Sequence, residues 1–375
     1  MQTDFIHLLD AQAIPAAPGP YELHSYDRYV VMFSGGKDSI ALYLALREAG
    51  VDNAKIELWH HPIDGKGSPL FMDWPCTTAY CQVFAAAFDV SLYRSWRDGG
   101  FERELLRDQA RTAAIHFEQP GGPIGRAGGT SGKRGTRRRF PQVSANLSVR
   151  WCSGALKIDV AAAALRNQAR FLRKRTLVLT GERAQESPAR AHYVPFEAHH
   201  TDRRHSVALR RHVDHLRLVH SWSEVQVWAI LERWRINPHP AYRLGWSRVS
   251  CAGCIFGNPD QWASLRAVNP EQFARIAAYE ADFGATIRRD RRSIVAAADV
   301  GTLYAAITPE RIAEALDPAW SGRIILPGVT LLFRVKRTLR ICESHWEAFQ
   351  EGPSWLIPAR AEISVFGFLT RFLNP

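Results

Sequence analysis

Cysteine is scarce in this sequence, and long hydrophobic runs are missing. Six cysteines in 375 residues are too few for a disulfide scaffold. No run approaches the ~18 apolar residues that a membrane-spanning helix needs. The first twenty residues contain Asp4 and Asp10 and no basic stretch leading into an apolar one, which argues against a signal peptide. We therefore expect a cytoplasmic protein in which clustered cysteines serve metal binding or catalysis.

Acidic residues are also in deficit. The 37 Asp and Glu residues face 48 Lys and Arg, so the formal net charge is +11 and the pI is near 9.6. This excess favours polyanionic partners, and it leaves nucleic acid, nucleotide phosphates and anionic membrane surfaces open. The composition, 46% hydrophobic and 23% charged, excludes a wholly disordered chain. The length predicts two or three domains at ~150 residues each.

Short apolar runs alternate with helical stretches along the first three quarters of the chain. Strands are expected at 29–33, 55–61, 90–96 and 176–180, and a helix at 40–49. This alternation predicts an α/β fold with an open, mostly parallel sheet. We expect an N-terminal extension over 1–24, a main domain over 25–285 and an accessory C-terminal α+β element over 286–375.

One segment breaks the pattern. Residues 119–139 contain seven glycines, two prolines, six Lys or Arg and no acidic residue. Such a stretch buries too little apolar surface to offset its ordering entropy, so we expect a mobile basic loop over about 118–142. Its cationic side chains are candidates for contacting a nucleic acid: Lys133, Arg134, Arg137, Arg138 and Arg139.

A glycine-rich hexapeptide, SGGKDS, lies between the first expected strand and the first expected helix. Two glycines let the backbone approach a phosphate closely, and the helix N-terminus directs N–H groups and a positive dipole at it. The side chains add hydroxyl and ammonium donors, and Asp38 can cap the helix and orient the loop. The alternative is a plain Gly-Gly turn capped by Asp-Ser. The candidate phosphate-binding residues are Ser34, Gly35, Gly36, Lys37, Asp38 and Ser39.

This hexapeptide does not match Walker A, and the nearest approach to that motif has Arg134 where Ser or Thr is required. It resembles the PP-loop of the ATP pyrophosphatase superfamily. Four further segments, RWCSGALK (150–157), GERAQESPARA (181–191), HPAY (239–242) and SCAGCIFG (250–257), resemble the phosphoadenylylsulfate (PAPS) reductase family and its sulfur-transferring relatives. The resemblance covers about residues 29–285. It implies an adenine nucleotide alpha hydrolase-like fold, binding of ATP with Mg²⁺, and cleavage between the α and β phosphates.

The GERAQES segment follows the strand expected at 176–180. Ligands bind at the carboxyl edge of open α/β sheets, and arginines offer bidentate donors to phosphate. The alternative is a solvated charged turn. The resemblance places this turn at the nucleotide, with Gly181, Glu182, Arg183, Glu186 and Ser187 as binding residues. We assign catalytic roles to Lys37, Asp38, Arg183 and Arg190.

Three further expectations concern the surroundings of this site. Ser221 and Glu224 form a capping box for a helix over 222–235. His239 and Tyr242 shape a pocket wall. Asp64 is a candidate carboxylate facing magnesium or ribose.

Cys251 and Cys254 form a CxxC pair, and Cys152 belongs to a separate motif. By resemblance to iron–sulfur adenylylsulfate reductases, these three would hold a four-iron four-sulfur (4Fe-4S) cluster, with Ser153 in place of a fourth cysteine. One iron would then be open, as in transfer RNA thiolases. The alternatives are zinc, completed by Cys76, Cys81 or a histidine, and no metal. Cys76 and Cys81 are also candidates for a fourth ligand or a persulfide carrier.

The thioredoxin-dependent reductases of this family end in a tail with a catalytic cysteine, and residues 361–375 contain none; Cys342 is expected to be a buried small hydrophobe. We therefore favour activation of an acceptor by ATP, giving AMP and pyrophosphate, followed by sulfur transfer, as in DNA phosphorothioation. The expected partners are DNA or tRNA and a sulfur donor such as a cysteine desulfurase, with no membrane. The alternatives are a PAPS or adenylylsulfate (APS) reductase and a nucleotide- or nucleic-acid-binding module without turnover.

Overall fold

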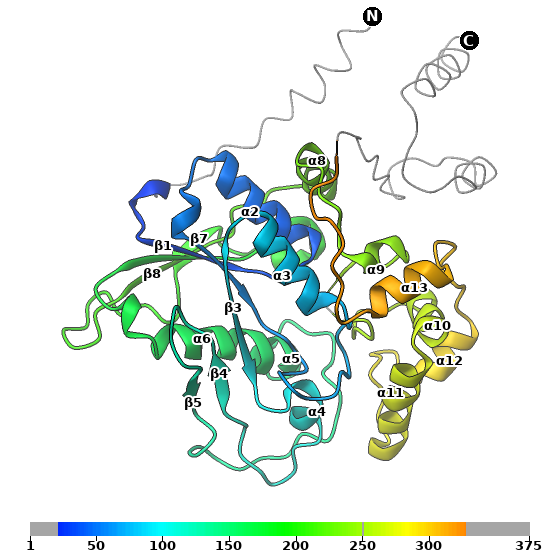
Figure 1. Ribbon diagram of the computed structural model, residues 1–375. Coiled ribbons are helices and arrows are strands. Elements are labelled where there is room, and N and C mark those ends of the chain that lie inside the picture. The colour runs from blue at the N-terminus through cyan, green and yellow to red at the C-terminus, as the bar shows by residue number, and fades with distance from the viewer. Residues whose placement is uncertain (1–21, 250, 328–375) are drawn as a thin grey trace, which may run out of the picture.

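The computed structural model describes residues 22–249 and 251–327, and these are built around one eight-stranded sheet (Figure 1). The strand order is β5-β4-β3-β2-β1-β6-β8-β7. The strands are β1 (Arg28–Met32), β2 (Ile56–His60), β3 (Ser91–Arg97), β4 (Ile115–Phe117), β5 (Gly125–Ala127), β6 (Arg175–Leu179), β7 (Phe196–Ala198) and β8 (His212–Leu216). The five strands β3, β2, β1, β6 and β8 are parallel, and the outer β4, β5 and β7 are antiparallel. The predicted α/β fold with a mostly parallel sheet is confirmed.

Both faces of the central strands are buried, and this explains their nearly continuous apolar sequences. On β1, Val30 belongs to a hydrophobic cluster with Val178 and Leu165, whereas its neighbours Tyr29 and Val31 belong to the larger cluster on the other face. Leu165 comes from α6 (Asp159–Arg166). The helices α2 (Lys37–Glu48) and α3 (Thr77–Ala87) contribute to the larger cluster. The sheet is therefore enclosed between helical layers.

The remaining helices connect the strands or gather at one side of the molecule. The connecting helices are α4 (Gly100–Leu105), α5 (Trp151–Ser153) and α7 (Pro188–Ala191), together with a π-helical turn over Gly154–Ile158 and 3-10 turns at Leu23–Ser25, Asn53–Lys55, Ala169–Phe171 and Ala184–Glu186. Helix α8 (Glu224–Arg233) packs on α2. The gathered group is α9 (Pro240–Arg243), α10 (Pro259–Val268), α11 (Pro270–Phe283), α12 (Ile294–Asp299) and α13 (Pro309–Leu316) (Figure 1).

Strand order reverses between β1 and β6. From β1 the chain adds β2 and then β3 on one side, and it later places β6 and β8 on the other. In open α/β sheets, ligands bind in the crevice outside the carboxyl ends of the strands at such a switch point. The SGGKDS loop after β1 and the GERAQES segment after β6 are therefore brought together by topology.

The basic segment at 119–139, predicted as a mobile loop, is irregular outside one short strand. That strand is β5, which pairs with β4, and Gly135 forms a bridge with Ala110. Arg137 and Arg138 pair with Glu104 and Asp282. Polar contacts and backbone hydrogen bonds therefore connect this segment to the rest of the fold.

Residues 286–327 add α12 and α13 to the same core. Ile294 and Ala298 of α12 lie in the larger hydrophobic cluster, and α12 packs on α10. Within this part, the pairing found is an isolated bridge between Ile236 and Ile325. The described residues therefore show no break in packing at residue 286, and Cys342 lies outside them.

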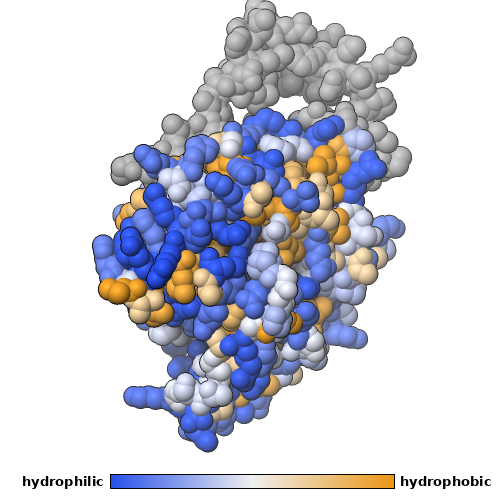
Figure 2. Space-filling model, turned by 60° about the vertical axis from the view of Figure 1, so that its left-hand side comes forward, coloured by the Kyte–Doolittle hydropathy of each residue, from blue (hydrophilic) through white to orange (hydrophobic). Residues whose placement is uncertain are grey.

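No helix among the described residues has the length and apolar character required to cross a membrane. Figure 2 shows a face of the molecule on which hydrophilic residues predominate and hydrophobic residues form separate patches. The five cysteines that the structure describes are all free thiols.

Candidate functional site

The SGGKDS loop leaves the carboxyl end of β1 and turns directly into α2. Gly35 has φ +74°, and a Cβ there would lie 3.1 Å from the Cys81 Sγ and 3.2 Å from the Tyr80 ring. A Cβ on Gly36 would lie 3.2 Å from the Val249 carbonyl oxygen. The backbone conformation at Gly35 therefore requires glycine, and the close neighbours of Gly35 and Gly36 leave no room for a side chain at either position.

Three backbone N–H groups of the loop donate to hydroxyl oxygens. The Ser34 N–H donates to Ser39 Oγ (3.3 Å), the Gly36 N–H to Ser34 Oγ (3.4 Å) and the Lys37 N–H to Tyr242 Oη (2.9 Å). The Ser39 hydroxyl in turn donates to the Gly36 carbonyl oxygen at 2.8 Å. Phosphate oxygens can replace these hydroxyl acceptors without leaving the N–H groups unpaired.

Lys37 is the first residue of α2, and its ammonium group is buried. The Nζ donates to the Ser247 carbonyl oxygen at 3.0 Å and lies 3.5 Å from Asp38 Oδ2 and 3.6 Å from Glu224 Oε1. Burial alone would lower the pKa of Lys37, but Tyr242, Asp38 and Glu224 together outweigh it and raise that pKa above its ordinary value. The site therefore holds a permanently charged ammonium at the phosphate loop.

Asp38 does not cap α2, and that expectation is corrected: Gly36 occupies the N-cap, without a side-chain cap. The Asp38 carboxylate instead pairs with the Nε of Arg183 at 2.5 Å. The buried Arg183 guanidinium also donates to Gln185 Oε1 at 3.0 Å and to the Trp222 carbonyl oxygen at 3.3 Å. This ion pair joins the loop after β1 to the loop after β6.

Gly181 brings the two loops into contact. A Cβ at this position would lie 2.9 Å from the Asp38 carbonyl oxygen and 3.2 Å from the Ser39 nitrogen, so the absence of a side chain permits the approach. Farther along, the Glu186 carboxylate accepts from the Arg183 N–H at 3.0 Å and pairs with Arg190. Of the predicted catalytic residues, Lys37, Asp38 and Arg183 are therefore brought into direct contact, and Arg190 is joined to them through Glu186.

Two other predicted binding residues have structural partners. Glu182 turns toward the next strand and pairs with Arg217 at 2.9 Å. Ser187 is the N-cap of α7, where its hydroxyl accepts from the Arg190 N–H at 3.3 Å. Arg248, which the sequence reasoning did not select, lies 3.7 Å from Glu186.

The predicted capping box is displaced by two residues. The N-cap of α8 is Ser223, whose Oγ accepts from the Gln226 N–H, while Gln226 Oε1 accepts from the Ser223 N–H. Ser221 and Glu224 are three positions apart, as are Ser223 and Gln226, so the sequence pattern alone was compatible with two positions of the capping box. In the observed register, Glu224 is the first helical residue, and its carboxylate faces Lys37.

The Asp64 side chain accepts hydrogen bonds from the backbone of the loop that follows it. Its Oδ2 accepts the N–H groups of Phe71, Met72 and Asp73 at 2.8–3.0 Å, and burial raises its pKa. No partner for its Oδ1 is found in the part of the chain that the structure describes. Asp64 thus organises residues 71–73.

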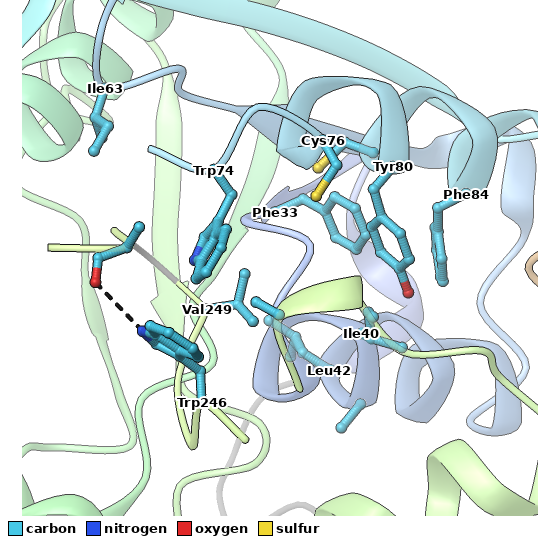
Figure 3. Close-up of a cluster of buried hydrophobic side chains, with 14 of the residues drawn as sticks. Phe33, Ile40, Leu42, Ile63, Trp74, Cys76, Tyr80, Phe84, Trp246 and Val249 are labelled. Carbon is cyan, nitrogen blue, oxygen red and sulfur yellow. Dashed lines mark hydrogen bonds between the residues drawn. The ribbon is translucent and has the colours of Figure 1, made fainter. Parts of the chain in front are cut away.

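The CxxC segment packs on this same loop. The Ala252 N–H donates to the Met72 carbonyl oxygen at 2.8 Å, and Trp246 Nε1 donates to the Ala252 carbonyl oxygen at 3.3 Å. Figure 3 shows Trp74 and Trp246 side by side next to Val249, and their ring centroids are 4.9 Å apart. Tyr242 contacts the phosphate loop, where its hydroxyl oxygen accepts the Lys37 N–H at 2.9 Å.

The three predicted ligand cysteines share one electrostatic neighbourhood. Burial raises the pKa of the Cys152 and Cys251 thiols, Cys254 adds to the rise at both, and the Lys157 ammonium opposes it. Within residues 22–249 and 251–327, however, no three His, Cys, Asp or Glu side chains are arranged to hold a metal ion. The arrangement of the thiols therefore gives no support to an iron–sulfur cluster or a zinc ion.

Cys76 and Cys81 lie beneath the phosphate loop rather than with the other cysteines. The Cys76 Sγ is 3.4 Å from His239 Nε2, and the Cys81 Sγ is 3.6 Å from His60 Nδ1. Burial raises the pKa of both thiols, and it lowers the pKa of His239 to about 3 and of His60 to about 4. These side chains are neutral packing groups at ordinary pH.

The predicted nucleic-acid contacts fall into two groups. Lys133, Arg134 and Arg139 are exposed. Arg137 pairs with Glu104 and stacks over the Trp151 ring at 4.8 Å, and Arg138 pairs with Asp282 at 2.8 Å. The second group is therefore committed to holding the segment in place.

The fold and this geometry define an α/β protein with a glycine-rich loop at the switch point of a mostly parallel sheet. No protein-family model matches the chain. The uncharacterized 37.8 kDa protein in the gpa 5′ region of Escherichia phage 186 is 35% identical over 151 residues, which make up 40% of this chain and 42% of that relative. The chain thus matches less than half of that relative's length.

Among solved structures, the chain is similar to FMN adenylyltransferase from Candida glabrata. The complex with FMN and the ATP analog AMPCPP gives a TM-score of 0.34 at 13% identity, covering 66% of this chain and 62% of that one. The complex with FAD and inorganic pyrophosphate gives 0.31 at 11%, covering 66% and 61%. At these TM-scores the likeness carries no argument about activity.

Proposed function

We propose that this protein binds ATP with Mg²⁺ at the SGGKDS loop and transfers its adenylyl group to an acceptor. An acceptor oxygen attacks the α-phosphorus, the bond to the β-phosphate oxygen breaks, and pyrophosphate leaves. The observation that carries the proposal is the convergence of Lys37, Asp38 and Arg183 on a glycine loop at the switch point. The position of the loop at the switch point, its N–H and ammonium donors, and the positive charge of Lys37 all suit the pyrophosphate end of a nucleotide.

The residues have distinct tasks in this reaction. The N–H groups of Ser34, Gly36 and Lys37 exchange their hydroxyl acceptors for phosphate oxygens. The Lys37 ammonium offsets the charge that develops on the departing pyrophosphate. Asp38 orients the Arg183 guanidinium, whose remaining donors are directed at Gln185 and the Trp222 carbonyl until phosphate is bound.

Release of pyrophosphate from ATP, with formation of the adenylylated acceptor, tests this proposal. The native chain is incubated with MgATP and candidate acceptors, and its rate is compared with that of Lys37→Met. The matched control is Lys66→Met, an exposed lysine that pairs with Glu118. Loss of turnover in the Lys37 variant alone supports the proposal. Absence of pyrophosphate release with every acceptor favours a binding module without turnover.

The finer proposal is that the activated acceptor then receives sulfur. Adenylylation turns the acceptor oxygen into a leaving group, so a sulfur nucleophile displaces AMP. The three thiols at Cys152, Cys251 and Cys254, grouped near Lys157, support a sulfur-handling role. A cysteine desulfurase would supply the sulfur, and DNA or tRNA would be the acceptor, as in phosphorothioation. Sulfite formation from PAPS or APS with a reductant would instead identify a reductase.

Iron and sulfide analysis after anaerobic purification tests whether a 4Fe-4S cluster occupies this cysteine site. Cys254→Ser is compared with Cys342→Ser, which alters a cysteine outside the three. Iron and sulfide that disappear only with Cys254 would show that the thiols rearrange around a cluster. Zinc in their place, or no metal, would remove the cluster and leave the thiols themselves as sulfur carriers.

A further inference from the structure

A cavity of about 330 Å³ opens beside the β4–β5 pair, and arginines dominate its charge. Four of its lining residues are Arg103, Arg111, Arg126 and Arg134, and the single acidic one is Asp98. The rest of the lining is mainly backbone of residues 110–114 and Gly129. This cavity is separate from the phosphate loop, since none of the SGGKDS residues lines it.

The charge of the cavity is not neutralised from within. All four arginines are exposed, and within the described residues none pairs with a carboxylate. Asp98 is already bound by His116 Nε2 at 2.9 Å. Four guanidinium groups that face one cavity repel one another unless an anion joins them, and each offers planar, bidentate donors suited to phosphate oxygens.

The structure also fixes the cavity's walls. Arg111 Nε donates to the Gly132 carbonyl oxygen at 3.1 Å, so the basic segment is tied to the chain that precedes β4. The bridge between Ala110 and Gly135 closes the same wall. The volume is at the low end of that found for ligand sites, which suits one unit of a polymer rather than a folded domain.

The cavity lies at the same edge of the sheet as the phosphate loop. Asp98 follows β3 directly, and β3 is two strands from β1, about 10 Å to the side at ~4.8 Å per strand. Met32 at the end of β1 is in register with Tyr93 through Trp59, so β3 continues about 13 Å beyond the end of β1 at ~3.3 Å per residue. Buried Arg97 donates to the Ala113 carbonyl oxygen at 2.7 Å and to the Ala155 carbonyl oxygen at 3.0 Å. Arg97 therefore links the cavity wall to the π-helical turn over Gly154–Ile158 that follows Cys152.

We propose that this arginine cavity binds the phosphate backbone of a single-stranded nucleic acid and so presents it to the nucleotide and cysteine sites. The inference rests on the proposed function, because it identifies the acceptor of that reaction as a nucleic acid. Exposed Lys133 and Arg139 lie on the same segment and add positive charge beside the cavity. The positively charged surface is therefore longer than one small anion requires. The arginines would bind phosphates rather than bases, so binding is strongly salt-dependent and weakly dependent on sequence.

Fluorescence anisotropy of a fluorescein-labelled 20-nucleotide single-stranded DNA, titrated with the full chain at several salt concentrations, tests the proposal. The variant Arg111→Glu/Arg126→Glu is compared with Arg203→Glu/Arg210→Glu, an equal charge change near the amino end of β8, at the opposite edge of the sheet. We expect the cavity variant to bind at least ~10-fold more weakly and its salt slope to fall by about 1.4, at ~0.7 for each phosphate that is no longer neutralised. Equally weakened binding in both variants would overturn the proposal.

Three further measurements distinguish loss of nucleic-acid binding from unfolding of the variant and from binding of a small anion. Arg103→Gln/Arg126→Gln, which keeps polar groups in the cavity, should weaken binding in the same direction if charge reversal unfolds the first variant. An RNA of the same sequence shows which sugar is preferred. If inorganic phosphate binds in an arginine-dependent way while DNA and RNA binding is unaffected, the cavity is a small-anion site and the proposal fails.

ATP binding by the same variants, measured by nucleotide titration without nucleic acid, should not change, because none of the SGGKDS residues lines the cavity. If the arginines bind the oligonucleotide but the native chain releases no pyrophosphate, the proposed function fails and the cavity assignment stands. If pyrophosphate is released but no oligonucleotide binds at about 50 mM salt, where phosphate contacts are strong, the assignment fails and the proposed function stands.

Discussion

The carboxylate of Asp38 lies 2.5 Å from the guanidinium Nε of Arg183, across 145 residues of sequence. The pair closes the switch point between β1 and β6, and it fixes one side of the candidate phosphate site. The ion pair connects the loop after β1 to the loop after β6, so a substitution in either loop should alter the geometry of both.

Replacement of Asp38 by Ala should remove this link without unfolding the chain. Arg183 would keep its hydrogen bonds to Gln185 and the Trp222 carbonyl but would have no carboxylate partner at Nε. We expect pyrophosphate release to fall by a factor of about 100 or more, the usual effect of removing an oriented charge-stabilising donor. Asp52→Ala, which alters an exposed aspartate capping a 3-10 turn, is the control. Near-normal turnover in Asp38→Ala would show that the pair is only structural.

Gly181→Ala should push the two loops apart. The added Cβ would lie 2.9 Å from the Asp38 carbonyl oxygen, which is backbone and has little freedom to move. We expect the free energy of unfolding to fall by about 1–3 kcal/mol, as in other over-packed sites, and ATP binding to weaken. Gly122→Ala, where the nearest atom is a flexible side chain at 3.3 Å, should change neither. Urea unfolding and nucleotide titration measure both effects.

The register of the capping box can be tested by a pair of serine substitutions. Ser223→Ala removes the hydroxyl that accepts the Gln226 N–H and should cost about 1 kcal/mol in the free energy of unfolding. Ser221→Ala alters an exposed residue outside the box and should cost only a few tenths of a kcal/mol. The opposite ranking in chemical denaturation would restore the register expected from the sequence.

Asp73 should make stability depend on pH. Burial, together with nearby Asp64, raises the pKa of Asp73 to about 7 from an unfolded value near 3.8. Between these two values the folded state binds the proton and the unfolded state does not, so stability falls as pH rises, by up to about 1.4 kcal/mol per pH unit. Asp73→Asn keeps an oxygen for the Trp74 N–H and the Thr77 hydroxyl but cannot ionise. Urea midpoints followed from about pH 4.5 to about pH 8 should therefore fall less steeply in this variant than in the native chain.

The sequence predicted the elements whose signals are local. The runs at 29–33, 55–61, 90–96 and 176–180 match β1, β2, β3 and β6 to within one or two residues because buried parallel strands are continuously apolar. The short outer strands β4, β5 and β7 were not predicted. Each has three residues, and their pairing depends on partners rather than on composition.

The site was predicted in its residue types but not in its pairings. Lys37, Asp38 and Arg183 were selected, yet their contacts depend on the strand order, which no local pattern encodes. Glu224 was assigned to a cap because Ser221 and Ser223 both satisfy the same spacing, and only packing of α8 on α2 distinguishes them. The arginine cavity was missed because Arg103 and Arg111 lie outside the basic segment in sequence and join it only through folding.

The β4–β5 pair has a further consequence because it lies at the end of the strand order. β5 pairs with β4 alone, so a change confined to residues 125–127 alters one strand pairing and leaves the pairing of β1 with β6 unchanged. For protein engineering, this makes β5 a natural place to graft a different recognition element while the central sheet stays the same.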